Sequence, residues 1–333
     1  MQVSPSVSVA LCTHNGTPYL AEQIASILGQ SELPGQLVLS DDASTDGTVA
    51  RATELVERYR ADHPAAMIEL LVIENGTALG VTRNFEQAIG ACTGELVVLC
   101  DQDDVWATDR VALATAQFAA RPDLLLLHAN ARLVDAAGAP IGYSLFDGIA
   151  LTPAELAEIH AGDEFRTLLR RNVVTGATTM FRRTLFEHAA PFPAPWVHDE
   201  WLAILASILG TTDALTEPLI DYRQHGSNQI GARKRSLGGM LAELGESRTE
   251  RGAYLVARAE ALQARLESLG GLVPRTALDL VVRKVAHERR RRDLPAFRLA
   301  RLAGVIRESR SGEYAHFGRP RYDIVRDLFQ PGA

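Results

Sequence analysis

The stretch "GELVVLCDQDDVW" (residues 94–106) runs from an apolar segment directly into three aspartates, Asp101, Asp103 and Asp104. The apolar part predicts a buried β-strand, and the acidic part predicts the loop at its carboxyl end. Carboxylates this close repel one another, and a buried carboxylate is costly unless it is paired or bound to a cation. The cluster is therefore either a turn solvated by water or a place where a positive charge binds.

The residues around this stretch alternate short apolar runs with helical patterns. Strands are predicted at residues 6–12, 35–40, 68–73, 95–100 and 124–129. Between them, Ala, Leu, Ile and Val recur at helical spacing in residues 18–30, 47–62, 82–91 and 107–120. Strands that alternate with helices form parallel βαβ units, whose strands are buried on both faces. The sequence predicts an α/β fold with a mostly parallel central sheet flanked by helices.

Polar clusters follow four of these strands. They are "THN" (13–15), "DDAS" (41–44), "ENGTALG" (74–80) and "DQDD" (101–104). In a parallel sheet, ligands bind at the edge where the carboxyl ends of the strands meet. Four separate loops therefore bring polar groups to one edge, and we expect a binding site there.

The acidic pairs have a functional and a structural explanation. Asp101 and Asp103 can both reach one divalent cation, and Mg²⁺ or Mn²⁺ binds to one or two carboxylates together with phosphate oxygens. A solvated acidic turn is the alternative. In "DDASTDGT" (41–48), Ser44 or Thr45 can cap the following helix, whereas a carboxylate of Asp41 or Asp42 can accept hydrogen bonds from a ribose or a base.

Length and composition describe an ordinary globular protein. The chain has 333 residues, 47% hydrophobic and 23% charged, enough for one large domain or two. Its first residues lack the pattern of a signal peptide, and no window offers the roughly 18 uninterrupted apolar residues of a membrane span. Three cysteines (Cys12, Cys92 and Cys100) form neither a disulfide framework nor a metal-binding spacing. A cytoplasmic location is expected.

Charge divides the chain into an acidic body and a basic tail. Residues 1–231 hold 13 Arg and no Lys against 29 Asp and Glu, whereas residues 232–333 hold 21 Lys and Arg against 12 Asp and Glu. Residues 247–269 predict an amphipathic helix, and residues 283–308 predict an Arg-rich helical pair broken near Pro295. The basic helices expose either a solvated face or a face for anionic lipid; nothing in the body favours nucleic acid. In the lipid case, four apolar residues point inward or toward the membrane: Leu299, Leu302, Val305 and Ile306.

Seven segments together resemble a known family. They are "VSVALCTHNGTPYLAEQIASILGQS", "LVLSDDASTDGT", "LGVTRNFEQAI", "GELVVLCDQDDVW", "NVVTGATTMFRR", "VHDEWLAILAS" and "EPLIDYRQHGSNQIG". In order and spacing they resemble family 2 glycosyltransferases of the GT-A fold, and within them the bacterial rhamnosyltransferase-like enzymes of surface-polysaccharide assembly. The resemblance covers residues 6–231. It implies a glycosyltransferase domain over residues 1–231, with a donor half at 1–130, an acceptor half at 131–231 and a basic helical region at 232–333.

The resemblance also implies roles for single residues. The donor nucleotide-sugar is expected to bind at Thr13, His14, Asn15, Asp41, Asp42, Gly80, Arg83, Asp101 and Gln102. A Mg²⁺ or Mn²⁺ ion is expected at Asp101, Asp103 and His225, and Asp199 matches the catalytic base. The acceptor is expected at Trp106, Thr175, Gly176, His198, Glu200 and Trp201. Structural alternatives are an N-cap role for Asp199 on a helix starting at Glu200, a hydrogen-bonded structural role for His225 and core positions for the tryptophans.

Two residues depart from the family's pattern. His198 stands where Glu is commoner before the catalytic aspartate, and His14 replaces an aromatic residue that stacks on the base. The remaining pattern implies direct displacement at the sugar with inversion. The resemblance also implies a glycan or a lipid-linked glycan as acceptor and a location in the cytoplasm or on the inner membrane face, and it leaves a homodimer open.

Two other function classes are open. A nucleotidyltransferase acting on sugar phosphates also uses aspartate-bound metal, but "CTHNGTPYL" lacks the basic residues of its phosphate loop. A non-catalytic nucleotide-sugar-binding protein is the second class. It needs no base at Asp199, so the presence of Asp199 argues against it. A dehydrogenase is disfavoured, because "THNGTP" does not match G-x-G-x-x-G.

Overall fold

The structure is a computed structural model that describes residues 5–226 and 248–331. The described chain divides into two compact units. The first unit contains residues 5–162, 174–192 and 197–226, and the second contains 163–173, 193–196 and 248–331. Two short segments of the predicted acceptor half thus belong to the same unit as the C-terminal helices.

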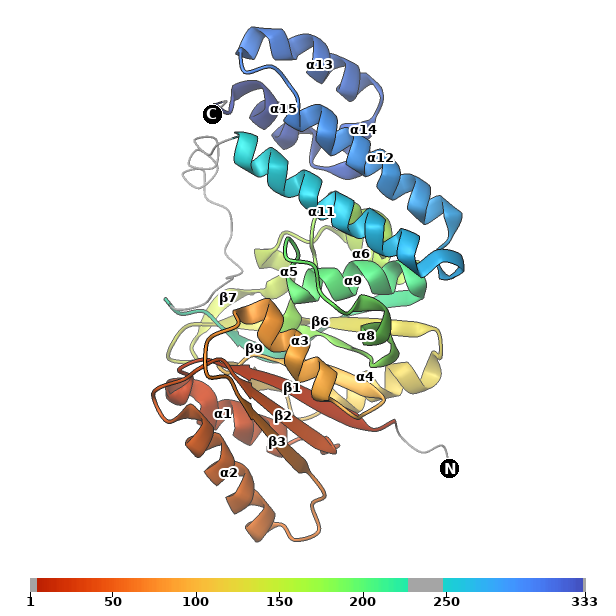
Figure 1. Ribbon diagram of the computed structural model, residues 1–333. Coiled ribbons are helices and arrows are strands. Elements are labelled where there is room, and N and C mark those ends of the chain that lie inside the picture. Colours follow the sequence, from red (N-terminus) through yellow and green to blue (C-terminus); the bar gives the residue numbers. More distant parts are fainter. Residues whose placement is uncertain (1–4, 227–247, 332–333) are drawn as a thin grey trace. The chain divides into compact units, whose positions relative to one another are not determined.

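Four parallel strands form one half of the sheet in the first unit (Figure 1). They lie in the order β3 (Glu69–Glu74), β2 (Gln36–Asp41), β1 (Val7–Thr13) and β4 (Leu96–Cys100). Every residue of β1, β2 and β4 is buried. This burial matches the continuous apolar runs of the sequence, because a parallel sheet is covered on both faces.

Helices cover this half of the sheet. α1 (Thr17–Leu28) and α2 (Thr48–Asp62) pack against each other, and α3 (Val81–Ala91) packs on β1 and β2 and against α9 (His198–Leu209). The predicted strands and helices of residues 6–120 are confirmed with ends shifted by up to three residues. α4 begins at Arg110 rather than 107 and ends at Ala120.

The other half of the sheet mixes strand directions. β8 (Met180–Arg182) lies antiparallel between β4 and β6 (Leu124–Val134). β9 (Thr211–Arg223) runs parallel to β6, and β5 (Val105–Trp106) and β7 (Pro140–Ser144) pair antiparallel with β9 and β6. β8 thus separates β4 from residues 124–129, and because it is antiparallel to both β4 and β6, those two strands still run in the same direction. The position of β8 in the sheet could not be predicted from its sequence, because its pairing depends on distant residues and leaves no local periodic signal.

Short helices complete the first unit. They are α5 (Leu145–Gly148), α6 (Pro153–His160), η1 (Gly176–Thr178) and α8 (Thr184–Ala189). α9 lies in the core, with nine of its residues buried, including Trp201, Leu202 and Leu205. α9 is therefore a rigid support for the acidic residues in its first turn.

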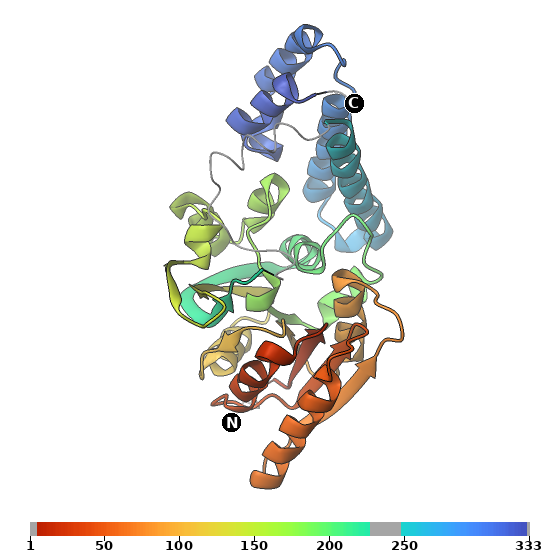
Figure 2. The same ribbon diagram turned by 90° about the vertical axis from the view of Figure 1, so that its left-hand side faces the viewer.

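The second unit is helical. It contains α7 (Glu164–Arg170), α11 (Arg248–Leu269), η2 (Gly270–Leu272), α12 (Arg275–Arg292), α13 (Arg298–Arg310), α14 (Glu313–Phe317) and α15 (Pro320–Phe329). Figures 1 and 2 show α11 and α12 side by side, joined by the short η2 turn. The predicted break near Pro295 is confirmed, since it lies between α12 and α13. Within the described residues, none of the helices combines the length and the apolar character needed to cross a bilayer.

The arginine run of α12 is paired within the second unit. Arg289 binds Glu260, Arg290 binds Glu308, and Arg292 binds Asp293. Arg291 is 5% exposed and donates to Asp327 at 2.7 Å and to Glu288 at 3.1 Å. The charge run of residues 289–292 is therefore used in structural ion pairs.

Candidate active site

The four polar loops predicted to share a sheet edge are linked to one another. The Thr13 hydroxyl donates to Asp41 at 2.7 Å, which joins the first loop to the second. The backbone N–H of His14 donates to Oε1 of Gln102 at 2.8 Å, which joins the first loop to the acidic loop. The backbone N–H of Thr45 donates to Oδ1 of Asn15 at 3.0 Å. The prediction that these loops meet is confirmed.

Asp41 and Asp42 hold this loop cluster together. Asp41 is 2% exposed and accepts hydrogen bonds from Thr13 and from the hydroxyl and N–H of Ser44. Asp42 accepts from the N–H of Leu79 at 2.6 Å and of Gly80 at 2.9 Å. In this structure the carboxylate of Asp41 is engaged in contacts between the loops, and its contact with the donor stays a prediction. Each carboxylate fixes the backbone of a loop that carries other polar groups.

Two glycines are explained by this packing. Gly80 has φ 82° and ψ 158°, a conformation that favours glycine, and its N–H points to Asp42. At Gly16, a Cβ atom would lie 2.4 Å from Oε1 of Gln102, so a side chain there would displace the bond between the loops. Arg83 follows Gly80 on α3; its half-exposed side chain pairs with Glu86.

The three aspartates after β4 form a compact negative cluster. Burial and the neighbouring charges of Asp103 and Asp199 raise the pKa of Asp101 to about 7. Burial, with Asp103 and Asp101 nearby, also raises the pKa of Asp104 well above its usual value. Asp104 accepts from the N–H of Arg223 at 2.9 Å, while its Oδ2 has no hydrogen-bond partner among the residues described. Keeping these carboxylates ionised and close together costs free energy, and a bound cation would offset that cost.

Arg110 lies behind the cluster and was not identified from the sequence. It is 3% exposed, donates to the carbonyl of Ala177 at 2.7 Å, and its charge opposes the raised pKa of Asp101 and Asp104. Its guanidinium carbon lies 4.0 Å from the ring centroid of Trp106. Trp106 is 5% exposed beneath this contact, which matches the alternative of a core position, and its contact with the acceptor stays a prediction. The sequence offered one signal for Arg110: it lies near the start of the helix predicted directly after the acidic loop.

The end of β9 is fixed to the acidic loop. Arg223 donates through Nε to the carbonyl of Asp103 at 2.8 Å and through Nη2 to Glu22 at 2.6 Å. Nε2 of His225 lies 2.6 Å from Oδ2 of Asp103, and the His225 ring stacks on Tyr19 with centroids 4.8 Å apart. His225 is thus brought beside a predicted metal ligand. Arg223 was missed, although it lies in the same "RQHG" segment.

Asp199 lies in the first turn of α9. Its Oδ2 accepts from the N–H of Gly176 at 2.9 Å, and its Oδ1 accepts from the N–H of Glu200 at 2.7 Å. The charge of Asp199 raises the pKa of Asp101, so the two acids share one site. Because α9 begins at His198 and follows Val197, the alternative in which Asp199 precedes and caps a helix starting at Glu200 is wrong.

Gly176 lies against both His198 and Asp199 of α9. A Cβ atom on Gly176 would lie 3.0 Å from Nε2 of His198 and 3.4 Å from Cβ of Asp199. Thr175, which precedes it, is partly exposed and accepts through its carbonyl from the hydroxyls of Thr178 and Thr179. A glycine is required here because α9 approaches the backbone so closely.

His198 and Trp201 lie in the core. His198 is 5% exposed, stacks on Phe85 at 3.9 Å between centroids, and burial lowers its pKa to about 3. Trp201 is fully buried and its indole N–H donates to the carbonyl of Ala189 at 2.8 Å. Trp201 therefore has the core position that was its structural alternative, and the contacts of both residues with an acceptor stay predictions. Glu200, on the same turn, is partly exposed.

The acidic loop fits a divalent cation that shares its shell with a ligand. Within residues 5–226 and 248–331, no group of three His, Cys, Asp or Glu side chains is placed to hold a metal ion by itself. Mg²⁺ commonly binds through one or two carboxylates and completes its shell with water and substrate phosphates. Asp101 and Asp103 supply hard oxygen donors of this kind. The pKa of Asp101 is raised because its negative charge is unfavourable here, and a bound cation would stabilise that charge.

Comparison with known proteins identifies related chains. A family model described as glycosyl transferase family 2 matches residues 8–188. A dTDP-rhamnosyl transferase from Shigella flexneri, RfbG, is 30% identical over 104 residues, which are 30% of this chain and 34% of that protein. The matched part spans only 29 to 35% of the length of the first curated relatives.

Solved structures share the fold at low sequence identity. TarS from S. aureus, in complex with UDP-GlcNAc, superposes with a TM-score of 0.55 and 17% identity over 85% of this chain and 72% of that one. A mannosyltransferase from Pyrobaculum calidifontis, in complex with GDP-Man and Mn²⁺, superposes with a TM-score of 0.52 and 19% identity over 98% and 86% of the two chains. The expected fold is confirmed: a GT-A-like α/β fold with a C-terminal helical region.

Proposed function

The chain belongs to glycosyl transferase family 2, and on that premise we propose that it moves a sugar from a nucleoside-diphosphate sugar to a glycan acceptor with inversion at the sugar. The observation that carries this proposal is the pairing of two acidic groups. Asp101 and Asp103 lie at the end of β4, and Asp199 comes from α9, close enough to raise the pKa of Asp101. Acids from two elements can act on opposite sides of one substrate.

The donor is proposed to bind over the linked loops. Thr13 is the last residue of β1, His14 and Asn15 follow it, and Gln102 accepts a hydrogen bond from the backbone N–H of His14. His14 is exposed, and its Nδ1 lies 2.6 Å from the carbonyl of Asp42, which holds the ring beside the second loop. The loops therefore offer polar groups for a nucleoside. Rhamnose is our first proposal for the sugar, supported by the similarity to the dTDP-rhamnosyl transferase.

Asp101 and Asp103 would hold a Mg²⁺ or Mn²⁺ ion, with His225 beside Asp103. Such an ion, when bound, neutralises negative charge on a departing diphosphate. The chain's own contribution is to keep the two carboxylates in place: Arg223 binds the backbone of Asp103, and His225 binds its side chain.

Asp199 is proposed as the base that takes the proton of the attacking hydroxyl. Hydrogen bonds from Gly176 and Glu200 fix its carboxylate, and 9% exposure leaves part of it accessible. A base held by backbone N–H groups on a buried helix keeps one orientation, which general-base catalysis requires. Thr175, Gly176 and Glu200 surround it and are proposed to border the acceptor.

The acceptor is proposed to be a glycan or lipid-linked glycan of a cell-surface polysaccharide, used at the inner face of the membrane. The sequence resemblance to surface-polysaccharide enzymes supports this acceptor class. A homodimer is a further possibility to be tested by sedimentation.

The test is a panel of UDP-, GDP- and dTDP-sugars, each with Mg²⁺, Mn²⁺ or EDTA. Release of nucleoside diphosphate, together with labelled sugar on a glycan acceptor, is expected for one donor and is expected to stop in EDTA. Pyrophosphate release would indicate a nucleotidyltransferase instead, and binding without turnover would indicate a non-catalytic binding protein.

Variants make this test specific. Asp101→Asn, Asp103→Asn and Asp199→Asn are expected to lower kcat by about 10²-fold or more, since each removes a charge that acts on the reacting groups. Asp62→Asn, on the exposed face of α2, is the matched control and should keep full activity. Unchanged turnover in folded Asp101→Asn and Asp199→Asn variants would contradict the proposal.

A further inference from the structure

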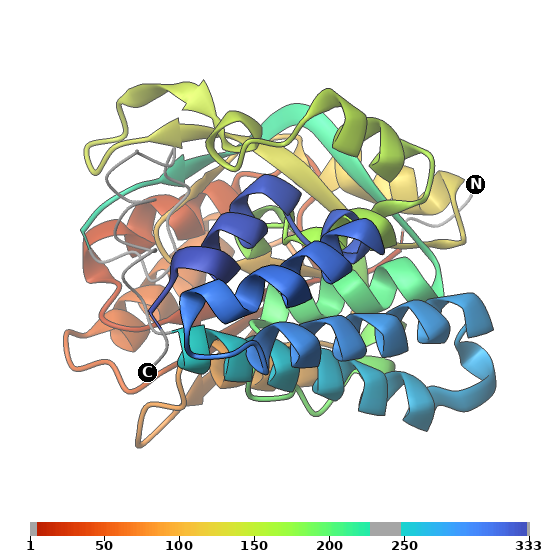
Figure 3. The same cartoon turned by 90° about the horizontal axis from the view of Figure 1, so that it is seen from above.

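Helix α13 of the second unit has two apolar sides. Its inner side packs against α14 and α15 through Val305, which is 3% exposed (Figures 1 and 3). Its outer side exposes Leu299 by 67%, Leu302 by 44% and Ile306 by 47%. Large apolar side chains that are exposed together on one side of a helix form the kind of patch that marks an interaction site.

The three exposed residues form one continuous ridge. Leu299, Leu302 and Ile306 are spaced by three and four residues, which places them on one side of the helix. Val305 and Arg301 are buried on the opposite side. Phe297, directly before the helix, is 68% exposed and extends the apolar surface at its N-terminal end.

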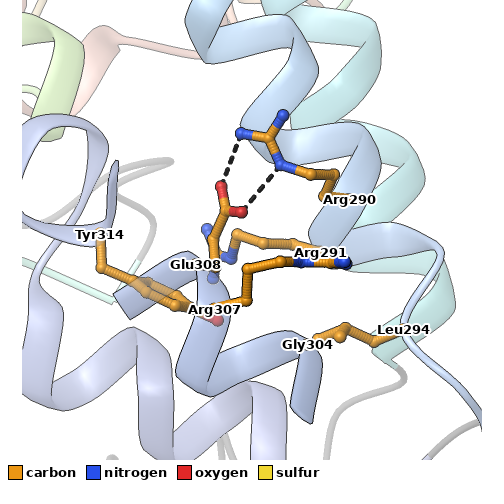
Figure 4. Close-up of a pocket in the computed structure, with 7 residues that line it drawn as sticks. All are labelled: Arg290, Arg291, Leu294, Gly304, Arg307, Glu308 and Tyr314. Atoms are coloured by element: carbon orange, nitrogen blue, oxygen red, sulfur yellow. Dashed lines mark hydrogen bonds and ion pairs between the residues drawn. The ribbon is translucent and has the colours of Figure 1, made fainter. Parts of the chain in front are cut away.

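Arginines without acidic partners border the ridge. Helical spacing places Arg298 on one side of it and Arg307 on the other, with Arg310 at its C-terminal end. Arg307 also lines a pocket with Arg290, Arg291 and Glu308 (Figure 4). Among the residues described, none of the three has an ion pair or a hydrogen bond from its side chain, in contrast to Arg289–Arg292 of α12. The one acid of α13, Glu308, is buried and accepts from Arg290 on the inner side (Figure 4).

The neighbouring helix α15 shows the same combination. Arg321, Val325 and Phe329 follow one another at intervals of four residues, and all three are exposed. α15 packs against α13. Two adjacent helices therefore expose apolar residues together with unpaired arginines.

We propose that the ridge of α13 (Leu299, Leu302 and Ile306, bordered by Arg298, Arg307 and Arg310) binds the surface of a membrane that contains anionic lipids. An interfacial helix buries an apolar side at the level of the headgroups while flanking arginines reach the phosphates. The outer side of α13 carries three positive charges and no exposed carboxylate, which matches an anionic surface. Self-association across the ridge would instead bring these arginines together with those of a second copy.

This inference goes beyond sugar transfer and does not depend on it. A chain that binds membranes but transfers no sugar would leave it standing, and an active enzyme that ignores membranes would overturn it. Binding is therefore measured without donor or acceptor.

The experiment is flotation of the full chain with vesicles of neutral phosphatidylcholine, with or without 30% anionic phosphatidylglycerol, at about 0.1 M salt. Binding is expected only to the anionic vesicles. The triple variant Arg298→Gln/Arg307→Gln/Arg310→Gln is expected to bind about a hundredfold more weakly, since each arginine near such a surface contributes about a factor of five. The double variant Leu302→Ser/Ile306→Ser is expected to lose binding about tenfold or more.

Matched controls come from exposed residues elsewhere. Arg51→Gln/Arg58→Gln/Arg166→Gln removes the same charge, and Met67→Ser/Leu113→Ser removes a similar exposed apolar area. Both controls should bind like the parent. All variants change exposed side chains, and circular dichroism checks that they fold.

Three results would overturn the proposal. The first is that the parent chain does not float with anionic vesicles. The second is that the ridge variants bind as well as the controls. The third is that Leu302→Ser/Ile306→Ser turns a dimer into a monomer without affecting flotation. The last result would assign the ridge to a second copy of the chain.

Discussion

At the scale of single residues, Asp101 combines a functional position with an unfavourable environment. Its pKa is raised to about 7 by burial and by the negative charges of Asp103 and Asp199. Because the unfolded chain releases this proton near pH 4, the folded protein without metal loses stability as pH rises from about 4 to 7. Because Asp101 lowers the stability of the metal-free protein and lies beside other acids, it is a candidate for binding a cation.

Asp101→Asn is therefore expected to stabilise the metal-free protein while it abolishes sugar transfer. The gain should be on the order of 1 to 3 kcal/mol at pH 8 and should shrink by pH 5, where the folded parent already holds the proton. Urea unfolding in EDTA at both pH values measures it. Asp62→Asn is the control on the surface, and a lower stability of Asp101→Asn at pH 8 would contradict the expected sign.

Gly176 sets the distance between α9 and the loop that contacts Asp199. A methyl group there would approach Nε2 of His198 to 3.0 Å and Cβ of Asp199 to 3.4 Å. Gly176→Ala is expected to lower kcat by tenfold or more, because Asp199 must shift, and to cost about 1–3 kcal/mol of stability through overpacking. Gly271→Ala, with open space around it, is the control. Parent-like kcat in Gly176→Ala would show that the position of Asp199 does not limit the reaction.

At the scale of elements, β9 determines the geometry of the acidic loop. Its last residue, Arg223, is 3% exposed and binds the carbonyls of Asp103 and Ala136 as well as Glu22. The "DQDD" loop therefore has its conformation only when a strand more than one hundred residues later is in place. This contact explains how three carboxylates remain close together.

Arg223→Ala is expected to destabilise the protein by about 2–4 kcal/mol, because it leaves buried carbonyls without a donor. Arg132→Ala is the matched control, since Arg132 is 58% exposed and its pair with Asp221 should be worth less than about 1 kcal/mol. Thermal unfolding of both variants measures these two losses of stability. Equal losses would mean that the buried contacts of Arg223 add nothing beyond an exposed pair.

At the scale of the whole molecule, the second unit depends on buried ion pairs of α12. Glu288 is 2% exposed and its carboxylate binds Lys284 and Arg291. Although burial acts to raise its pKa, these two cations lower it to about 2. The pairs therefore stabilise the folded state above about pH 4.5, and this contribution is lost as pH falls toward 2.

Glu288→Gln is accordingly expected to weaken the second unit at pH 7 by about 1–3 kcal/mol and to make it less sensitive to acid between pH 4.5 and 2. Hydrogen exchange of α11 and α12 peptides follows this unit separately from the sheet. Glu267→Gln, exposed on α11, is the control. An unchanged acid response in Glu288→Gln would assign acid sensitivity to other pairs.

The sequence by itself determined the parallel half of the sheet and the cluster of loops at its edge. Both follow from local periodicity: buried strands read as continuous apolar runs, helices repeat every three to four residues, and polar loops fall at the same strand ends. Asp101, Asp103 and Asp199 were identified as candidates because their segments keep the order and spacing of a family, and their roles in sugar transfer stay proposals.

Tertiary structure alone decided how the site is assembled and which predicted residues are accessible. The insertion of β8, the contacts of Arg223 with the acidic loop, and the burial of Trp106, Trp201 and Asp41 all depend on residues far apart in the chain. Local patterns show that a residue is apolar or polar, but exposure and pairing result from which distant segments pack around it. For the same reason, the arginines at 289–292 of α12 form ion pairs, whereas Arg298, Arg307 and Arg310 of α13 are exposed near an apolar ridge.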